Sequence, residues 1–165
     1  MQGNASTVLL DTMFHEALTL TREVQHYIAS TAPGDRASLD TTARMTMASE
    51  ITRLTRRLTV AVVWLRLQRS VQNGEMSHDD ICARFPPLCD NLVCLDDASG
   101  NQALPARLRS LLRRSLQVYQ RISRLDRRMR DRAGAGESVA QPIPDMPGVH
   151  TLHTDIRGRA PCSPV

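Results

Sequence analysis

Apolar residues recur at intervals of three and four positions in three long stretches of the chain. Such spacing places them on one face of a helix, so the pattern predicts helices over about residues 7–30, 40–73 and 104–132. We expect Pro33 and Gly34 to end the first helix, with a turn over 32–38, and Gly74 to end the second. Three amphipathic helices in succession favour an all-α fold, an antiparallel three-helix bundle with a long central helix.

The middle stretch carries two apolar stripes instead of one. A heptad pattern marks the first stripe, through Met47, Ile51, Leu54, Leu58, Ala61, Leu65 and Gln68. The second stripe lies roughly 130° away around the helix, at ~100° per residue, and consists of Val60, Trp64, Leu67 and Val71. It has two interpretations. Either the middle helix contacts both neighbours on separate faces, or the second stripe is a homodimer interface, because an exposed patch of this kind is otherwise a liability.

The rest of the chain is less regular. The pattern predicts an irregular insert over residues 75–103, within a helical domain that spans 1–132. Inside the insert, a capping box and a pair of prolines bound a short helix, at Ser77 with Asp80 and at Pro86 with Pro87. Residues 133–165 lose the periodicity and are rich in Pro and Gly, which predicts a disordered C-terminal tail.

The composition fits a chain of packed helices. Apolar residues make up 41% of it and aromatic residues only 3%, so a core must be built mainly from aliphatic side chains. The longest apolar run, Val60 to Leu65, is far shorter than the ~20 residues that cross a membrane. The first residues lack the basic and apolar segments of a secretory signal, so we expect a cytoplasmic protein.

All 21 basic residues are arginine, and ten of them lie between Arg107 and Arg132 in the third predicted helix. A basic helix can follow nucleic-acid phosphates, which makes a small nucleic-acid-binding or transcription-associated protein the alternative function. These arginines spread around the polar arc, and no helix-turn-helix spacing is present. A solvated face, or a surface for a protein partner, is the commoner explanation of such a pattern.

One group of residues has metal-ligand chemistry. A histidine and three cysteines in the insert could supply four zinc ligands, at His78, Cys82, Cys89 and Cys94. Because no C-x-x-C pair is present, we expect reduced cysteines there and neither a metal nor another cofactor. The histidines and carboxylates elsewhere form no catalytic constellation, which indicates that the protein is not an enzyme.

Several short strings recur together in the middle and last helices. They lie at Ser49–Leu58, Val63–Arg69 (with W-L-x-x-Q-R), Gly74–Ser77, Leu104–Leu108, Ser115, Tyr119 and Arg124–Asp126. In this combination they resemble the RcdA family, the alphaproteobacterial regulators of CtrA degradation, and the likeness extends in outline from Phe14 to Met129. The chain departs from the family pattern at Ser70 and in the cysteine-bearing segment 82–100.

The resemblance implies a three-helix-bundle homodimer that acts as an adaptor for the ClpXP protease. Such an adaptor helps to deliver cell-cycle regulators for degradation, in cooperation with response-regulator and cyclic-di-GMP effector proteins. Charged residues beside the heptad pattern of the middle helix are the candidates for partner binding: Arg53, Arg56, Arg57 and Arg69. The competing interpretation of these arginines is ordinary pairing along the helix surface, at spacings of three and four residues.

Overall fold

The structure, a computed structural model, describes residues 3–137 and contains no β-strand in that range. Its elements in chain order are α1 (Gly3–His26), the π-helix η1 (Tyr27–Thr31), α2 (Ala32–Ala37), α3 (Thr41–Gln72), α4 (His78–Arg84), the 3-10 helix η2 (Leu88–Asp90), α5 (Leu92–Leu95) and α6 (Ala106–Glu137). The expected all-α fold with a long central helix is therefore confirmed. The expected disordered tail is wrong for its first residues, because α6 continues to Glu137, and residues 138–165 lie outside the described part.

Pro33 does not end the first helical stretch. The helix widens at η1, where the Ala32 N–H donates to the carbonyl of Tyr27, and α2 follows at once. Pro33 then sits in the first turn of α2, where its missing N–H costs no hydrogen bond. The expected turn over 32–38 is therefore wrong, and the stretch stays helical to Ala37.

The ends of α3 and the start of α4 follow the predicted local chemistry. The Asp40 carboxylate caps α3 by accepting a 2.7 Å hydrogen bond from the Ala43 N–H. Gly74 lies just beyond the other end of α3 at φ 75°, a left-handed conformation that favours glycine. At the start of α4, Ser77 and Asp80 form the reciprocal capping box that their spacing predicts.

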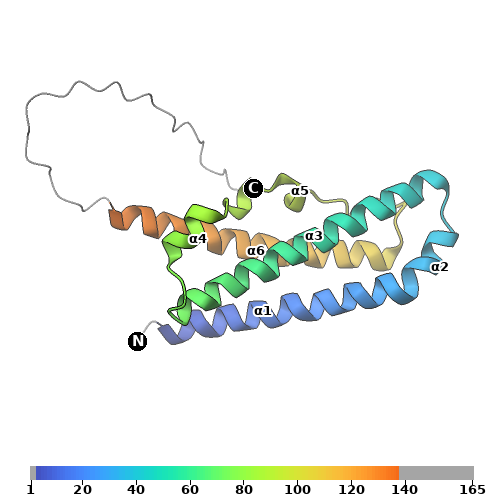
Figure 1. Ribbon diagram of the computed structural model, residues 1–165. Coiled ribbons are helices and arrows are strands. Elements are labelled where there is room, and N and C mark those ends of the chain that lie inside the picture. The colour runs from blue at the N-terminus through green and yellow to red at the C-terminus, as the bar shows by residue number, and fades with distance from the viewer. Residues whose placement is uncertain (1–2, 138–165) are drawn as a thin grey trace, which may run out of the picture.

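The three long helices α1, α3 and α6 pack along one another, as Figure 1 shows. Their directions differ from the expected antiparallel arrangement. Arg57 of α3 bonds Ser115 of α6, and Trp64, further along α3, bonds Asp126, further along α6. The two helices therefore run in the same direction, with α1 opposite to both (Figure 1). The insert makes this possible because it carries the chain back along the molecule before α6 begins.

The core lies where the three long helices meet and consists mostly of aliphatic side chains, with three buried aromatic residues, Tyr27, Trp64 and Tyr119. α3 contacts α1, α6, α4 and α5, so it is covered on more than two sides. This explains why α3 carries apolar residues around much of its circumference. No helix among the described residues has the length and hydropathy needed to cross a membrane.

Candidate protein-binding site

Arg57 holds the insert against the long helices. Its side chain is 1% exposed, and its guanidinium donates to the carbonyls of Cys94 and Asp96, each at 2.7 Å. The same guanidinium reaches α6, where it donates to Ser115 Oγ at 2.8 Å and to the Leu112 carbonyl at 3.2 Å. Burial lowers the pKa of Arg57, and these neutral oxygens compensate its lost hydration. One buried side chain thus joins three segments of the chain.

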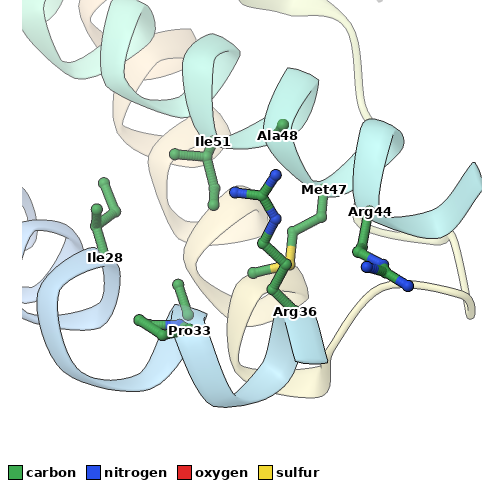
Figure 2. A pocket seen from close by; sticks show the side chains of 8 residues that line it. Ile28, Pro33, Arg36, Arg44, Met47, Ala48 and Ile51 are labelled. Carbon is green, nitrogen blue, oxygen red and sulfur yellow. The ribbon is translucent and has the colours of Figure 1, made fainter. Parts of the chain in front are cut away.

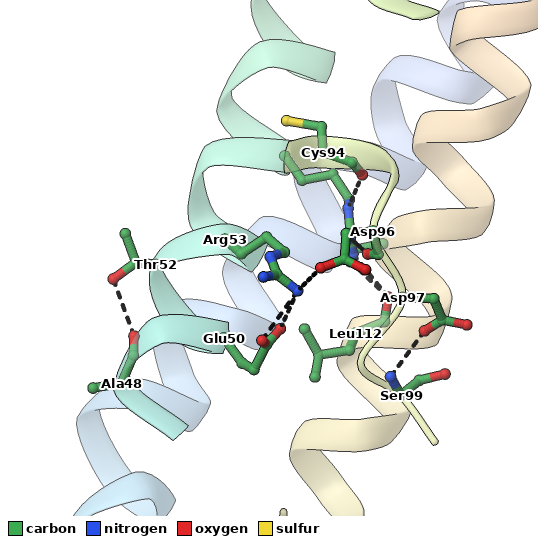
Figure 3. A network of polar contacts seen from close by, with 11 residues as sticks. Ala48, Glu50, Thr52, Arg53, Cys94, Asp96, Asp97, Ser99 and Leu112 are labelled. Carbon is green, nitrogen blue, oxygen red and sulfur yellow. Dashed lines mark hydrogen bonds and ion pairs between the residues drawn. The ribbon is translucent and has the colours of Figure 1, made fainter. Parts of the chain in front are cut away.

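Arg53, one turn earlier on α3, lies between two carboxylates (Figure 3). Its Nη1 is 3.0 Å from a carboxylate oxygen of Glu50 and 2.7 Å from one of Asp96 in the insert. Glu50 is nearly buried; burial raises the pKa of its carboxyl group, and the charge of Arg53 opposes that effect. Arg53 therefore reinforces the position of the insert at the same place as Arg57.

A second buried anchor lies on α6. The carboxylate of Asp126, 1% exposed, accepts hydrogen bonds from Trp64 Nε1 and from the Leu88 N–H, each at 2.9 Å. Arg130 lies 3.0 Å from the same carboxylate and also donates to the Phe85 carbonyl at 2.9 Å. These bonds fix the proline-containing segment of the insert to α6.

The segment fixed in this way forms one wall of an apolar groove. Opposite it stands α3, and the groove of about 260 Å³ is lined by Thr59, Val60, Val63, Trp64, Leu67, Phe85, Pro86, Pro87, Leu88 and Asn91. We call this the Trp64 groove. Its rim is open, since the side chains of Val63 and Phe85 are 45% and 38% exposed. A rigid apolar groove with polar residues nearby is suited to holding part of a protein partner.

The comparisons with known proteins identify the family. A family model described as "Protein of unknown function (DUF1465)" matches residues 1–148. Among solved structures, the crystal structure of RcdA from Caulobacter crescentus CB15 matches at 35% sequence identity and a TM-score of 0.60, over 73% of this chain and 90% of that one. The chain belongs to the RcdA family. No curated protein sequence matches it.

The structure corrects the set of partner-binding arginines that the family likeness suggested. Arg57 is buried inside the chain, so it serves the fold and cannot face a partner. Arg53 is engaged by two carboxylates. Arg69 pairs with Asp11 of α1 at 3.3 Å and lies over the ring of Phe14. Arg56 is exposed and makes no ion pair with the described residues, which leaves it as the best partner-binding candidate of the four.

The second stripe of α3 also needs correction. Trp64 is 3% exposed and covered by residues of its own chain, so it does not form the exposed centre of a dimer interface. The stripe faces the insert, which supplies the opposite wall of the Trp64 groove. Val60, Leu67 and Val71 remain half-buried, and only these members of the stripe are available to a second copy.

The candidate zinc ligands do not come together. No group of three or more His, Cys, Asp or Glu residues within the described range could hold a metal ion. Cys82 and Cys94 are free thiols, whereas Cys89 is disulfide-bonded and therefore departs from the expectation of reduced cysteines. Cys94 is fully buried, and burial raises the pKa of its thiol.

The two buried anchors were missed in the sequence, although helical spacing could have revealed them. Arg57 lies three positions after Leu54 and four before Ala61, inside the heptad stripe. Asp126 follows Ile122 by four positions on the apolar face of α6. A charged residue in the middle of an apolar face is a candidate for a buried, hydrogen-bonded group. Ser115, which occupies a heptad position of α6, is buried as well.

Proposed function

We propose that the chain is a non-enzymatic adaptor that binds other proteins and assists ClpXP-type proteolysis of cell-cycle regulators in the cytoplasm. The observation that carries this proposal is the likeness to Caulobacter RcdA, at 35% identity over 90% of that chain. By the same likeness, the adaptor forms a homodimer and works with response-regulator co-adaptors and their cargo proteins.

The rigid insert supports a binding role. Arg57 and Asp126 hold it by bonds that are buried or nearly so, and it borders an open apolar groove beside α3. A surface that is already ordered loses little conformational entropy when a partner binds. Arg56, exposed next to Thr59 and Val60 of this groove, adds an unpaired positive charge that suits an acidic partner.

The nucleic-acid alternative gains no support from α6. Three of its ten arginines are already paired: Arg114 with Glu23, Arg121 with Glu16 and Arg130 with Asp126. The first two pairs hold α6 against α1, so these arginines support the packing of helices. Fewer charges than the sequence suggested are thus available for a phosphate backbone.

The direct test is capture of partners by the full-length tagged protein from its native bacterium, followed by mass spectrometry. We expect a ClpX-type unfoldase and a response regulator among the captured proteins. Purified ClpXP should then degrade a captured cargo faster with the chain than without it. Recovery of DNA and nucleoid proteins alone, with sub-micromolar DNA binding that persists at physiological salt, would replace the adaptor by the nucleic-acid alternative.

Arg56→Glu provides the matched test of the surface. It reverses an exposed charge beside the Trp64 groove and breaks no ion pair with the described residues, so the fold should be unchanged. Arg128→Glu makes the same charge change on an exposed position of α6. If the surface near Arg56 binds partners, only Arg56→Glu should reduce capture of the unfoldase or the response regulator. Equal loss in both variants would indicate a general charge effect.

A further inference from the structure

A second apolar hollow lies at the other end of α3, away from the Trp64 groove. Figure 2 shows it between the turn formed by η1 and α2 and the first part of α3. Its volume is about 460 Å³, which lies within the ~300–1,000 Å³ typical of small-ligand sites. Ile28, Pro33, Met47 and Ile51 supply its apolar lining.

Two arginines stand at this hollow, and no carboxylate lines it. Arg36 comes from α2 and Arg44 from α3. The Arg36 side chain makes no hydrogen bond or ion pair with any described residue. Arg44 donates only from Nε, to the Leu39 carbonyl at 2.9 Å, which leaves its terminal nitrogens without a bond to the described residues. The hollow therefore combines apolar surface with two positive charges that nothing nearby neutralises.

The local backbone explains how this hollow arises. The wide turn of η1 precedes α2, and it places Ile28 and Pro33 along one side of the hollow. A π-turn is rare and energetically poorer than an α-helical turn, and such turns occur frequently at functional sites. Ile28 is 39% exposed, so the hollow presents apolar surface to its surroundings.

A ligand for this hollow must carry an apolar group and an anion close together. In an extended peptide, neighbouring side chains point to opposite faces, so an acidic residue and its apolar neighbour cannot both enter one hollow. The last residue of a chain carries its side chain and a free carboxylate on the same α carbon. Arginine binds a carboxylate through two parallel hydrogen bonds, and two arginines can share one.

We propose that the hollow binds the C-terminal residue of a partner protein, an apolar residue whose free carboxylate is held by Arg36 and Arg44. This inference rests on the adaptor function proposed above and names one class of partner for it. Ile28, Pro33, Met47 and Ile51 receive the apolar side chain.

The test uses the full chain and two pools of synthetic dodecapeptides with the last four positions randomised. One pool ends in a free carboxylate and the other in an amide. The immobilised chain should retain the free-acid pool and enrich Leu, Ile, Val, Met or Phe at the last position. The amide pool should bind at least about tenfold more weakly, because it lacks the charge-assisted bonds. Equal retention of both pools, or enrichment of an internal acidic residue, would overturn the proposal.

Three variants tie the result to the hollow. Ala48→Trp adds bulk to an exposed position in its lining and should abolish the enrichment. Arg36→Ala and Arg44→Ala should each weaken the selected peptides by about fivefold or more, the effect of one charge-assisted contact. Met45→Trp is the matched control, because Met45 is 71% exposed on the same helix and does not line the hollow. Helical content by circular dichroism confirms that every variant is folded.

The remaining outcomes assign the hollow differently. If neither pool is retained while decanoate binds and Ala48→Trp prevents it, the hollow takes a fatty acid and the peptide proposal is wrong. A dimer that Ala48→Trp dissociates would make the hollow a contact between copies, which also overturns the proposal. Capture of the unfoldase by a chain that enriches no peptide removes this inference and leaves the adaptor function in place. Enrichment without such capture does the reverse.

Discussion

The indole N–H of Trp64 lies 2.9 Å from the carboxylate of Asp126, and this buried hydrogen bond joins the middle of α3 to the second half of α6. The other oxygen of the same carboxylate accepts the Leu88 N–H, so both of its oxygens are used. Arg130 supplies the positive charge that a buried carboxylate requires. A tryptophan that sequence analysis assigned to a dimer interface thus belongs to the internal support of the insert.

Removing this carboxylate should destabilise the chain strongly. Asp126→Ala leaves the Trp64 indole, the Leu88 N–H and the Arg130 guanidinium without their acceptor. We expect a loss of about 3–5 kcal/mol in the free energy of unfolding, measured by urea titration. Asp131→Ala, an exposed change on the same helix, should stay within about 0.5 kcal/mol of the wild type. Equal effects of the two changes would show that the Asp126 bonds contribute little.

Arg57 should control the order of the insert. Arg57→Met keeps much of the side-chain volume but leaves the Cys94 and Asp96 carbonyls without their donor. Hydrogen–deuterium exchange of the backbone amides around Cys94 should therefore accelerate, while α1 stays protected. Arg57→Lys retains a charge but cannot present the planar fork that reaches all four oxygens, so it should restore protection only partly. Unchanged exchange in Arg57→Met would contradict this role.

Two carboxyl groups should give stability changes of opposite sign with pH. Burial raises the pKa of Glu50 above the ordinary value of 4.5, so the folded chain binds that proton more tightly than the unfolded chain does. The contribution of Glu50 to stability is thus lost as pH rises from about this value through its raised pKa. Relative to Glu50→Gln, the wild type should lose unfolding free energy as pH increases above 4.5, measured by urea titration in a pH series.

Glu23 supplies the matched comparison. Its hydrogen bonds with Arg114 lower its pKa below 4.5. Here the folded chain releases the proton more readily, so the contribution of Glu23 is present above pH 4.5 and is lost as pH falls through its lowered pKa. Relative to Glu23→Gln, the wild type should gain unfolding free energy as pH rises in the acid range. The gain should be small, because both partners are partly exposed to solvent. The same sign for both residues would refute the assignment of causes.

The exposed part of the second stripe can be tested for self-association separately from the core. If a second copy covers it, Val71→Glu should reduce the mass measured by light scattering from dimer to monomer and leave the helical content unchanged. Trp64→Glu should instead unfold the chain, because it places a charge inside its own core. Met45→Glu, on an exposed position of α3, is the control. A wild type that is monomeric, or a Val71→Glu variant that stays dimeric, would exclude this interface.

The sequence predicted the three long helices because their apolar spacing and caps are local features. Asp40, Gly74 and Ser77 act within four residues of their own positions, so their effects can be derived without knowledge of the fold. Pro33 was misinterpreted, because a proline ends a helix in its interior but is tolerated in a first turn, and the wide turn of η1 created a new first turn.

The candidate site was harder to predict, because it depends on which segments meet. Nothing local reveals that the carbonyls of Cys94 and Asp96 reach Arg57, which lies 37 and 39 positions away. The same limit applies to the second stripe of α3: its spacing showed a second contact face but could not distinguish the insert from another copy of the chain. Helical spacing did place Arg57 and Asp126 on apolar faces, and that signal alone could have marked both as buried.

The parallel course of α3 and α6 has a consequence for how this protein folds. α1 and α3 are joined by a short connection and can pair early, whereas Trp64 and Asp126 are 62 positions apart. Their contact requires a large loop to close, and the entropy lost in that closure comes before the contact gives any return. Docking of α6 should thus be the slow step, later than the α1–α3 pairing. Substitutions on α6 should then change the folding rate less than the unfolding rate if α6 docks after the transition state.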